Sequence, residues 1–368
     1  MVKYVYEYPN WPRFNWDEQK VQLILGNVRH LQGKILGQMG ALGFSEKEEA
    51  ILSTVTLDVI KSSEIEGESL NYDQVRSSIA RRLGINIAGL VHSSRDVEGV
   101  VEMLLDATRN FEAPLDEDRL FGWHSALFPS GRSGMHKIDV GKYRFGEMAI
   151  VSGPMGKEKI HYKAPSPAKV QNYMDQFLEW FNNGNNADPV LKAAIAHFWF
   201  IIIHPFDDGN GRIARAISDL MLARSDGSHQ RFYSLSNQML IERKDYYNLL
   251  QKEQYSDGDI TKWLDWFLNC LYRALKASEK LLDRVFIKTN FWEKHKETEL
   301  NSRQRLMINK LLDGIDGKLK TSKWAKITRC SQDTALRDIK DLISKGILRQ
   351  EDSGGRSTNY EIIETNNW

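Results

Sequence analysis

The chain has 368 residues, of which 41% are hydrophobic, so it can form two domains and bury a sizeable core. Fifty basic and 49 acidic residues leave a net charge of +1, which excludes a chain-wide basic field for binding nucleic acid or membranes. Two cysteines, Cys270 and Cys330, are too few for a disulfide framework or a cysteine-rich zinc site.

The N-terminus has no basic stretch followed by an apolar one, so no signal peptide is predicted. The longest apolar stretch, residues 193–203, falls well short of the ~20 residues that a membrane-spanning helix needs. We therefore expect a cytoplasmic protein in a reducing compartment, with no membrane partner.

In chain order, the aromatic and proline-containing residues 6–16 are expected to lie extended against the body of the protein. Most of residues 17–285 then has apolar side chains spaced three and four apart, which is typical of helices. Residues 140–165 break this pattern, because two short strand-like runs, 147–151 and 159–162, flank a Gly-Pro turn and predict a β-hairpin.

The most apolar run, residues 190–203, has apolar side chains on every side of a helical wheel, which predicts a buried central helix. Pro205 disfavours helical backbone at His204, so the helix should end there and the imidazole should lie at its C-terminal end. His204 is thus a candidate base, although a lone histidine before a proline is more often structural.

The residues that follow have the features of an anion site. Gly209 and Gly211 permit a tight turn in which N–H groups converge, and a second helix should open at Arg212. Anions bind where such a turn meets a helix N-terminus. Arg212 and Arg215 are three positions apart, so both guanidinia would lie on one helix face. With the carboxylate of Asp208 beside them, these residues predict a polyphosphate site.

The C-terminal part has a different pattern. Residues 299–314, 322–330 and 331–346 predict three helices, the third with Ser331 as its N-cap. Two β-rich runs around Gly354 and Gly355 predict a wing, so residues 297–364 are expected to form a winged helix-turn-helix domain.

Residues 317–349 carry nine basic and three acidic side chains, an excess that would suit the phosphates of DNA. The acids Asp333, Asp338 and Asp341 all fall on the predicted recognition helix, where they oppose DNA binding. A winged helix that dimerises the chain or recruits a protein target is an equally weighted alternative.

Residues 204–215, HPFDDGNGRIAR, resemble the HxFx(D/E)GNGRxxR signature of the Fic family, whose members transfer AMP from ATP to a hydroxyl side chain of a target protein. The resemblance covers roughly residues 50–275. It implies a mainly α fold, with a Fic-type helical core and a small β-hairpin flap, and it implies ATP as co-substrate and Mg²⁺ as cofactor. We divide the chain into an N-terminal aromatic and helical segment at 1–45, a Fic core at 46–285 and the winged helix.

By resemblance, His204 is the general base, Asp208 binds Mg²⁺ and Phe206 anchors the loop from inside. The turn would cradle the α- and β-phosphates with Asn210 bonded to phosphate, Arg212 would clamp the β-phosphate, and Arg215 would meet the γ-phosphate. The implied ATP-binding set is Gly209, Asn210, Gly211, Arg212, Ile213, Ala214, Arg215 and Tyr247.

Two positions refine this expectation. Family members that act as kinases carry a larger residue at the second glycine, so the intact Gly211 favours AMP transfer. Tyr246 and Tyr247 match the place of an aromatic pair near the adenine base, and Tyr247 is our choice for stacking. The alternative is that both tyrosines pack a helix.

The predicted hairpin, residues 145–163, follows Tyr143 and Arg144 and corresponds to the Fic flap. By resemblance it holds the modifiable segment of the target protein through main-chain pairing, which is the strand-addition mode of peptide capture. The alternative is an ordinary surface hairpin.

Residues 62–67, SSEIEG, resemble the (S/T)xxxE(G/N) inhibitory motif of Fic enzymes, with Ser62 and Glu66 at its defined positions on an inhibitory helix at about 46–70. Gly67 should end this helix just after Glu66. A bidentate pair of Glu66 with Arg215 would occupy the cation that the γ-phosphate needs. The sequence therefore predicts an autoinhibited protein adenylyltransferase.

Two other functions stay open at this point. In the reverse reaction, Glu66 would position a water that removes AMP from a modified target. In a DNA-binding regulator, the core would sense nucleotides and the winged helix would bind DNA. A homodimer that locks the inhibitory helix is also compatible with the sequence.

Overall fold

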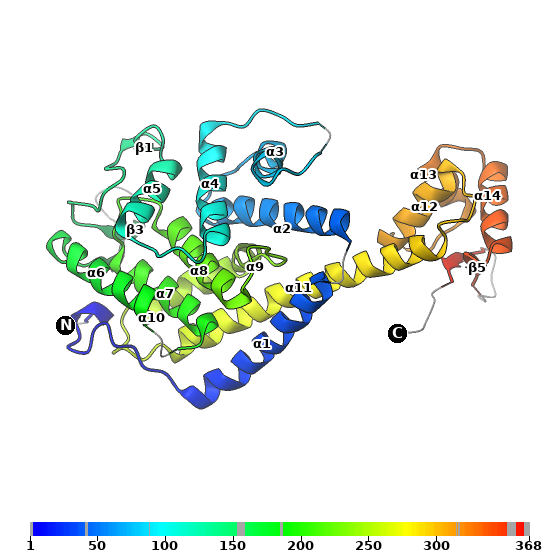
Figure 1. Cartoon of the computed structure of the whole chain (residues 1–368). Coiled ribbons are helices and arrows are strands. Elements are labelled where there is room, and N and C mark those ends of the chain that lie inside the picture. Colours follow the sequence, from blue (N-terminus) through cyan, green and yellow to red (C-terminus); the bar gives the residue numbers. More distant parts are fainter. Residues whose placement is uncertain are drawn as a thin grey trace. The chain divides into compact units, whose positions relative to one another are not determined.

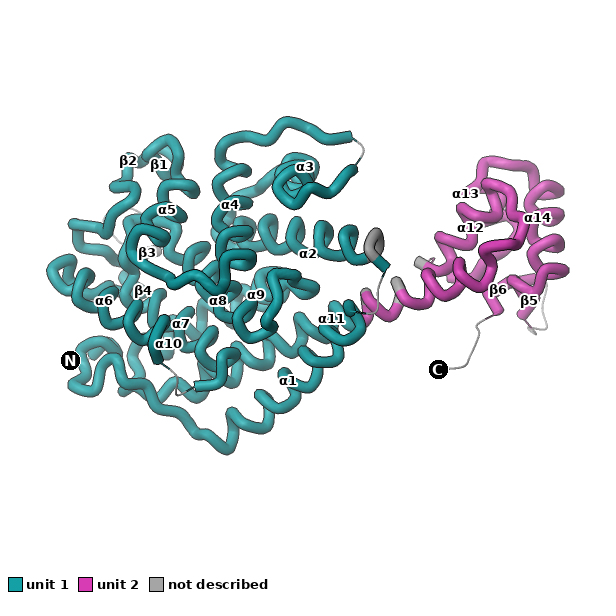
Figure 2. The backbone as a smooth tube through the Cα atoms, in the orientation of Figure 1, with its two compact units in different colours: residues 1–279 teal, residues 280–368 magenta. Residues whose placement is uncertain are grey.

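The computed structural model describes residues 3–40, 43–87, 89–152, 159–184, 187–313, 315, 317–351 and 358–363. They belong to two compact units, residues 1–279 and 280–368, which we describe separately (Figure 2). Within the described ranges there are 15 helices and three two-stranded antiparallel hairpins (Figure 1). The mainly α fold class with small hairpins is thus confirmed.

Unit 1 begins with the 3₁₀ helix η1 (Val5–Glu7) and the helices α1 (Glu18–Gly40), α2 (Phe44–Ile65), α3 (Tyr72–Leu83), α4 (Arg95–Arg109) and α5 (Glu117–Leu127). Two hairpins follow, β1 (Arg132–Ser133) with β2 (His136–Lys137) and β3 (Ala149–Ser152) with β4 (Lys159–Lys163). The unit continues with α6 (Pro167–Asn183), α7 (Pro189–Ile203), α8 (Asn210–Asp226), α9 (Leu235–Ile241), α10 (Arg243–Glu253) and α11 (Thr261–Lys294), whose last turns belong to unit 2.

The helix α7 is the centre of unit 1. Thirteen of its residues are buried, as its apolar sequence predicts, and it packs between α6 and α8. Asp188 caps its N-terminus by accepting a hydrogen bond from the Val190 N–H at 2.8 Å. The N-terminal segment lies against this core as expected, since the rings of Trp11 and Phe14 make edge contacts with the ring of Trp199. It is not extended as we expected, because η1 is followed by turns in which the Trp11 N–H donates to the Tyr8 carbonyl.

Two local expectations need correction. The second helix of the motif starts at Asn210 rather than at Arg212, because Gly209 already adopts the left-handed conformation, at φ 81°, that lets the chain turn into α8. The hairpin β1–β2 lies in a region that we expected to be helical. Its short strands meet around Gly134, which has a φ of 53°, so a glycine turn interrupts the helical pattern there.

Unit 2 contains α12 (Ser302–Asp313), α13 (Thr321–Thr328), α14 (Gln332–Ser344) and the hairpin β5 (Leu348–Gln350) with β6 (Tyr360–Ile362). Leu319, just before α13, bridges to Tyr360 and adds a third short segment to the hairpin. Trp324, Ile339 and Leu342 are completely buried between these elements. This order of elements is that of the predicted winged helix-turn-helix; the expected wing turn at Gly354 and Gly355 lies outside the described residues.

Among the described residues, no helix is both long and apolar enough to cross a membrane. Both cysteines are free thiols, Cys270 buried and Cys330 partly exposed.

Candidate active site

His204 caps the C-terminus of the buried helix α7, with the left-handed backbone angles φ 51° and ψ 59°. A residue other than glycine adopts this conformation at a cost of about 1 to 2 kcal/mol, so its surroundings must hold it there. Its Nδ1 lies 3.2 Å from the Ile201 carbonyl, a contact that requires the hydrogen on Nδ1. The other ring nitrogen, Nε2, is therefore the proton acceptor.

The environment of His204 also sets its charge. Burial lowers the pKa of His204 to about 4, and the positive charge of Arg144 acts in the same direction, while the Ile201 carbonyl, Glu66 and Asp208 oppose the shift. The imidazole is consequently neutral at pH 7, which is the form that can accept a proton.

Arg144 holds the His204 loop in place. Its Nε donates to the His204 carbonyl at 2.8 Å, and its Nη2 donates to the Pro165 carbonyl at 2.6 Å. Its own N–H donates to the Pro205 carbonyl at 2.9 Å. Our sequence reasoning used Tyr143 and Arg144 only to locate the flap and missed this role, because the partners of Arg144 are backbone carbonyls without a side-chain signature.

The interior of the motif loop is held by Phe206 and Asn210. Phe206 is fully buried and stacks on His124 with 4.2 Å between ring centroids, as expected of an anchor. The Asn210 side chain donates to the Phe206 carbonyl at 2.8 Å and accepts from the Phe206 N–H at 3.0 Å. The amide of Asn210 therefore closes the loop from inside, and its expected bond to phosphate stays a prediction.

The carboxylate of Asp208 is oriented from two sides. One oxygen accepts the Gly209 N–H at 2.5 Å, and the other accepts the hydroxyl of Ser133 on β1. The neighbouring Asp207 accepts the N–H of Asp139 at 3.0 Å, so the segment around β1–β2 is attached to both aspartates. Ser133 was missed because a serine in a polar turn carries no sequence signal of this contact.

Arg215 and Glu66 meet, as the inhibitory motif predicts. Nη2 of Arg215 lies 2.8 Å from Oε1 of Glu66, and the Ser62 hydroxyl and carbonyl accept hydrogen bonds from Nε and Nη2, each at 2.8 Å. Nη1 of Arg215 is buried and has no hydrogen-bond partner in the described part of the chain. The pair is therefore not the bidentate one that we expected.

The end of α2 places Glu66 at this point. The N–H of Glu68 donates to the Ser63 carbonyl and that of Gly67 to the Glu64 carbonyl, both at 3.0 Å, while Gly67 has a φ of 86°. These are the paired hydrogen bonds of a Schellman motif, which ends the helix with Glu66 as its C-cap. Opposite Glu66, a Cβ on Gly211 would come within 2.1 Å of its Oε1, so the contact requires a glycine there.

A second carboxylate, Glu68, pairs with the other motif arginine. Oε2 of Glu68 lies 2.5 Å from Nη1 of Arg212, whose guanidinium sits 5.0 Å from the ring centroid of Phe128. Nε of Arg212 is buried without a partner in the part of the chain that the structure describes. Burial raises the pKa of Glu68, and Arg212 acts in the opposite direction. In the sequence, the position of Glu68 two residues after Glu66 was the one indication of this contact.

Ile213 and Ala214, which we counted in the ATP-binding set, are fully buried residues on α8. Their side chains are therefore part of the packed core, and only their backbone remains for a contact with a ligand.

The two tyrosines of α10 have different environments. Tyr246 is buried, and its hydroxyl lies 2.9 Å from Nε2 of His197, which is typical of a core residue. Tyr247 is 40% exposed, and its hydroxyl lies 3.3 Å from Oε2 of Glu66. Of the two, Tyr247 is thus the one that borders the site.

The hairpin β3–β4 forms as expected, although its turn lies outside the described residues. Tyr162 on β4 is buried, donates its hydroxyl to the Ile202 carbonyl and has its ring centroid 6.4 Å from that of His204. Ile150 and Ile160 are exposed on the two strands. Tyr162 therefore packs beside the candidate base, while Ile150, its register partner on β3, and Ile160 stay exposed.

A divalent cation would have one carboxylate here, that of Asp208. No cluster of three or more metal-binding side chains occurs within the described ranges. Mg²⁺ is usually held by one or two carboxylates together with substrate phosphates and water, so Asp208, oriented by Ser133 and the Gly209 N–H, fits such a role.

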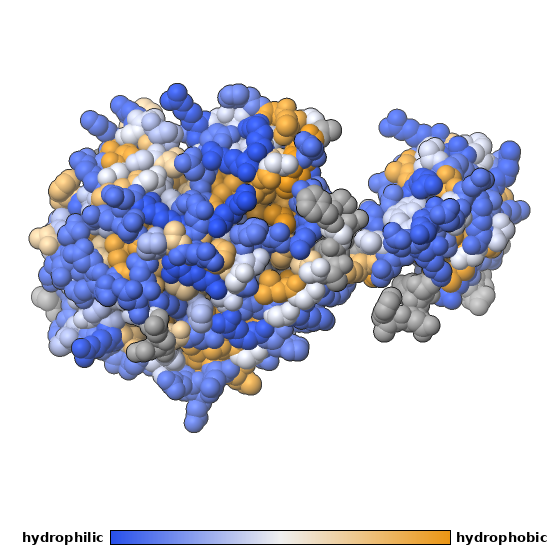
Figure 3. All heavy atoms as spheres, viewed as in Figure 1, coloured by the Kyte–Doolittle hydropathy of each residue, from blue (hydrophilic) through white to orange (hydrophobic). Residues whose placement is uncertain are grey.

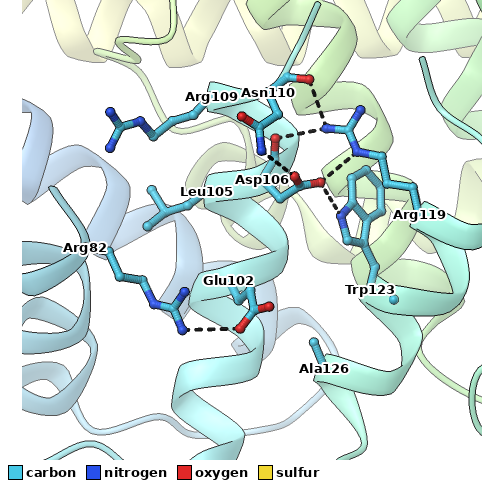
Figure 4. A pocket seen from close by; sticks show the side chains of 10 residues that line it. Arg82, Glu102, Leu105, Asp106, Arg109, Asn110, Arg119, Trp123 and Ala126 are labelled. Atoms are coloured by element: carbon cyan, nitrogen blue, oxygen red, sulfur yellow. Dashed lines mark hydrogen bonds and ion pairs between the residues drawn. The ribbon is translucent and has the colours of Figure 1, made fainter. Parts of the chain in front are cut away.

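A cavity of about 470 Å³ lies elsewhere in unit 1, between α4 and α5 (Figure 4). Its charged residues are largely paired with one another, since Arg119 binds Asp106 at 2.7 Å and Arg82 binds Glu102 at 3.2 Å. It is lined by Arg82, Glu102, Leu105, Asp106, Arg109, Asn110, Arg119, Gly122, Trp123 and Ala126. None of these belongs to the motif, so we do not place the nucleotide there.

Residues 114–222 match the Fic/DOC family, and residues 4–85 match DUF4172, a domain of unknown function. The chain thus contains a region that matches the Fic/DOC family after an N-terminal region that matches DUF4172. His204 and the arginines of α8 lie in the Fic part, whereas Glu66 and Glu68 lie in the DUF4172 part. The two carboxylate contacts therefore join the two matched regions.

The chain is distantly related to protein adenylyltransferases. It is 29% identical to protein adenylyltransferase fic-1 of Caenorhabditis elegans over 177 residues, which cover 47% of this chain and 32% of the relative. It is 26% identical to protein adenylyltransferase Fic of Aedes aegypti over 242 residues, which cover 64% of this chain and 43% of the relative. The chain thus spans about a third to two fifths of the length of these relatives.

Solved structures show the same fold. A Fic family protein from Desulfovibrio desulfuricans G20 superposes with a TM-score of 0.56 at 19% identity, covering 97% of this chain and 99% of that one. A Fic domain-containing signaling protein from Bacteroides thetaiotaomicron gives a TM-score of 0.51 at 21% identity, covering 72% of this chain and 97% of that one.

Proposed function

We propose that this protein is an adenylyltransferase that moves AMP from ATP to a Tyr, Ser or Thr hydroxyl of a target protein, and that Glu66 inhibits it. The observation that carries the proposal is the pair of buried guanidinia on α8. Arg212 and Arg215 each keep one buried nitrogen without a partner in the described residues, beside a glycine turn at a helix N-terminus. A polyphosphate satisfies both nitrogens and the turn together.

In the transfer, the acceptor hydroxyl gives its proton to Nε2 of His204, and its oxygen bonds to the α-phosphorus of ATP. The bond from the α-phosphorus to the bridging oxygen breaks, and pyrophosphate leaves. Arg212 and Arg215 hold the β- and γ-phosphates, while Arg144 fixes the loop that carries His204. Asp208 would hold Mg²⁺, which would offset negative charge on the phosphates.

Inhibition follows from competition for the same cations. Glu66 occupies Arg215, which the γ-phosphate needs, and Glu68 occupies Arg212, which the β-phosphate needs. A ligand or partner that relieves this inhibition must bind more tightly to the protein in which these two carboxylates have moved away from the arginines. The hydroxyl of Tyr247 adds a weak contact to the inhibited arrangement.

The position of the label tests the reaction. Glu66→Gly protein incubated with Mg²⁺ and ATP labelled on the α-phosphate should become labelled, whereas ATP labelled on the γ-phosphate should leave it unlabelled. Transfer of the γ-label would mean a kinase and would refute AMP transfer. Adding wild-type protein to the labelled, washed product tests the reverse reaction, because a de-AMPylase would release the α-label.

The target protein is proposed to bind along β3–β4. An extended segment can pair with the edge of a hairpin through its main chain, and exposed Ile150 and Ile160 offer apolar contacts to its side chains. The buried Tyr162 would fix this hairpin next to His204, where the acceptor hydroxyl must arrive.

Glu68→Gln is expected to raise AMP incorporation several-fold, but less than Glu66→Gly does. The change frees Arg212 while Arg215 stays occupied, and Glu68 is about half exposed, so its ion pair is weaker. Glu64→Gln is the matched control, because Glu64 pairs with Lys61 instead of a motif arginine. Equal initial rates for both variants and wild type would exclude a role of Glu68 in the inhibition of AMP transfer.

The pH dependence is expected to follow the depressed pKa of His204. In Glu66→Gly protein, kcat/KM should be flat between about pH 6 and 8 and should fall only near pH 4 to 5, where the base gains its proton. Initial rates between pH 4 and 8, with the target at a concentration well below its KM, measure it. A midpoint near 6.5 would mean that burial does not lower the pKa of His204.

A further inference from the structure

Two of the three acids that opposed DNA binding in the sequence, Asp338 and Asp341, are bound by residues at the start of α12. Asp338 is buried and accepts hydrogen bonds from both Nε and Nη2 of Arg303, at 2.7 and 3.0 Å, and from Asn301 at 2.9 Å. Asp341 accepts from Gln304 and Lys345, at 2.7 and 2.6 Å. Two of the three acids thus fasten α14 to the start of α12, and the objection drawn from them does not hold.

The basic side chains remain on the outside. Those that are exposed and have no ion-pair or hydrogen-bond partner among the described residues are Lys320, Lys326, Arg329, Arg337 and Lys340. They lie on α13, on α14 and in the turn between these helices. Asp333, in the first turn of α14, is the acid that stays exposed with them. The helix-turn-helix thus presents a positive surface.

The helix α14 has two distinct faces. Ala335, Ile339 and Leu342 are buried in the core of the unit. Arg337 and Lys340 are three positions apart and lie on the opposite, exposed face. Between α13 and α14 the chain turns within residues 329–331, where Arg329 has a φ of 53°. This is the arrangement in which the second helix of a helix-turn-helix enters the major groove of DNA.

We infer that unit 2 binds duplex DNA, with α14 in the major groove and with the exposed basic residues of α13, of the turn and of α14 on the phosphates that border the groove. Charge complementarity favours DNA over a protein partner. The exposed face of α14 carries a single large apolar residue, Ile343, whereas protein interfaces centre on apolar and aromatic anchors. Figure 3 shows that hydrophilic side chains predominate on the drawn face of this unit.

The test uses the full-length chain and a fluorescent duplex of about 30 base pairs, long enough for several helical turns of DNA. Fluorescence anisotropy is measured between about 50 and 200 mM salt, where counterion release makes binding steeply salt-dependent. Arg337→Ala/Lys340→Ala protein is expected to bind about tenfold more weakly at low salt, and its salt slope should fall by about 2, one for each lost phosphate contact.

Lys294→Ala/Lys296→Ala protein is the matched control. It loses the same charge from the same unit, outside the helix-turn-helix, and should bind DNA almost as wild type does. Circular dichroism verifies that both variants are folded. An equal loss in both variants, or no salt-dependent binding of the duplex by folded wild-type protein, overturns the inference; so does capture of a protein by this face without binding of the duplex. AMP transfer by unit 1 should be unchanged in both variants, so the outcome is independent of the proposed enzymatic function.

Discussion

Glu66→Gly protein is expected to incorporate AMP about 10- to 100-fold faster than wild type, which corresponds to the 1 to 3 kcal/mol typical of coupling between two binding events. The reason is local. Arg215 is buried, and its charge is at present balanced by Glu66 at 2.8 Å. Without that carboxylate the guanidinium remains buried and lacks an anion, so the γ-phosphate becomes its best partner.

The measurement is the initial rate of α-label incorporation at fixed ATP and Mg²⁺. Glu64→Gly is the matched control, because it puts the same new glycine two residues earlier in α2, where the Glu64 side chain forms an ion pair with Lys61 and none with a motif arginine in the described part of the chain. If both variants are activated equally, loosening of α2 rather than release of Arg215 is responsible. Equal rates for Glu66→Gly and wild type would show that Glu66 does not inhibit AMP transfer.

His204→Asn in the Glu66→Gly background is expected to lower the rate of AMP transfer by about 10²- to 10⁴-fold, the usual contribution of a general base. Asparagine is preferred to alanine because residue 204 has a φ of 51°, a left-handed conformation that asparagine adopts more readily. The loop should therefore keep its shape, since Arg144 binds the carbonyl of residue 204 and not its ring.

Mass spectrometry after incubation with ATP and Mg²⁺ measures this loss, as an adduct of AMP mass that is absent from the variant. Binding of a fluorescent ATP analogue should change little, because the phosphates are held by α8 and not by His204. A variant that binds the analogue and still transfers AMP at an undiminished rate would show that His204 is not the base.

The helices and the motif followed from the sequence because their causes are local. The apolar run before His204 could only form a buried helix, Pro205 ended it, and the glycines after Asp208 allowed the turn into α8. Residues 62–67 likewise ended their helix at Glu66 through the left-handed Gly67. In each case the backbone conformation is determined by neighbours within four residues, so it can be predicted from the sequence.

What the sequence could not reveal depends on partners far away along the chain. Glu68 meets Arg212 across 144 positions, and Ser133 meets Asp208 across 75. Asn210 has the residue type of a phosphate ligand, but its side-chain oxygen and nitrogen both form hydrogen bonds with the backbone of Phe206. A side chain's type states which bonds it can make, whereas its place in the fold decides which of them it does make.

The same division applies to the whole protein. By itself the sequence determined the helical core, the motif at 204–215 and the end of α2 at Glu66, since helical periodicity, glycine turns and proline are local physical constraints. The tertiary structure alone decided that a second carboxylate, Glu68, holds Arg212, and that Asp338 and Asp341 accept hydrogen bonds from residues at the start of α12. Those contacts arise only when separate helices pack and bury their charges together.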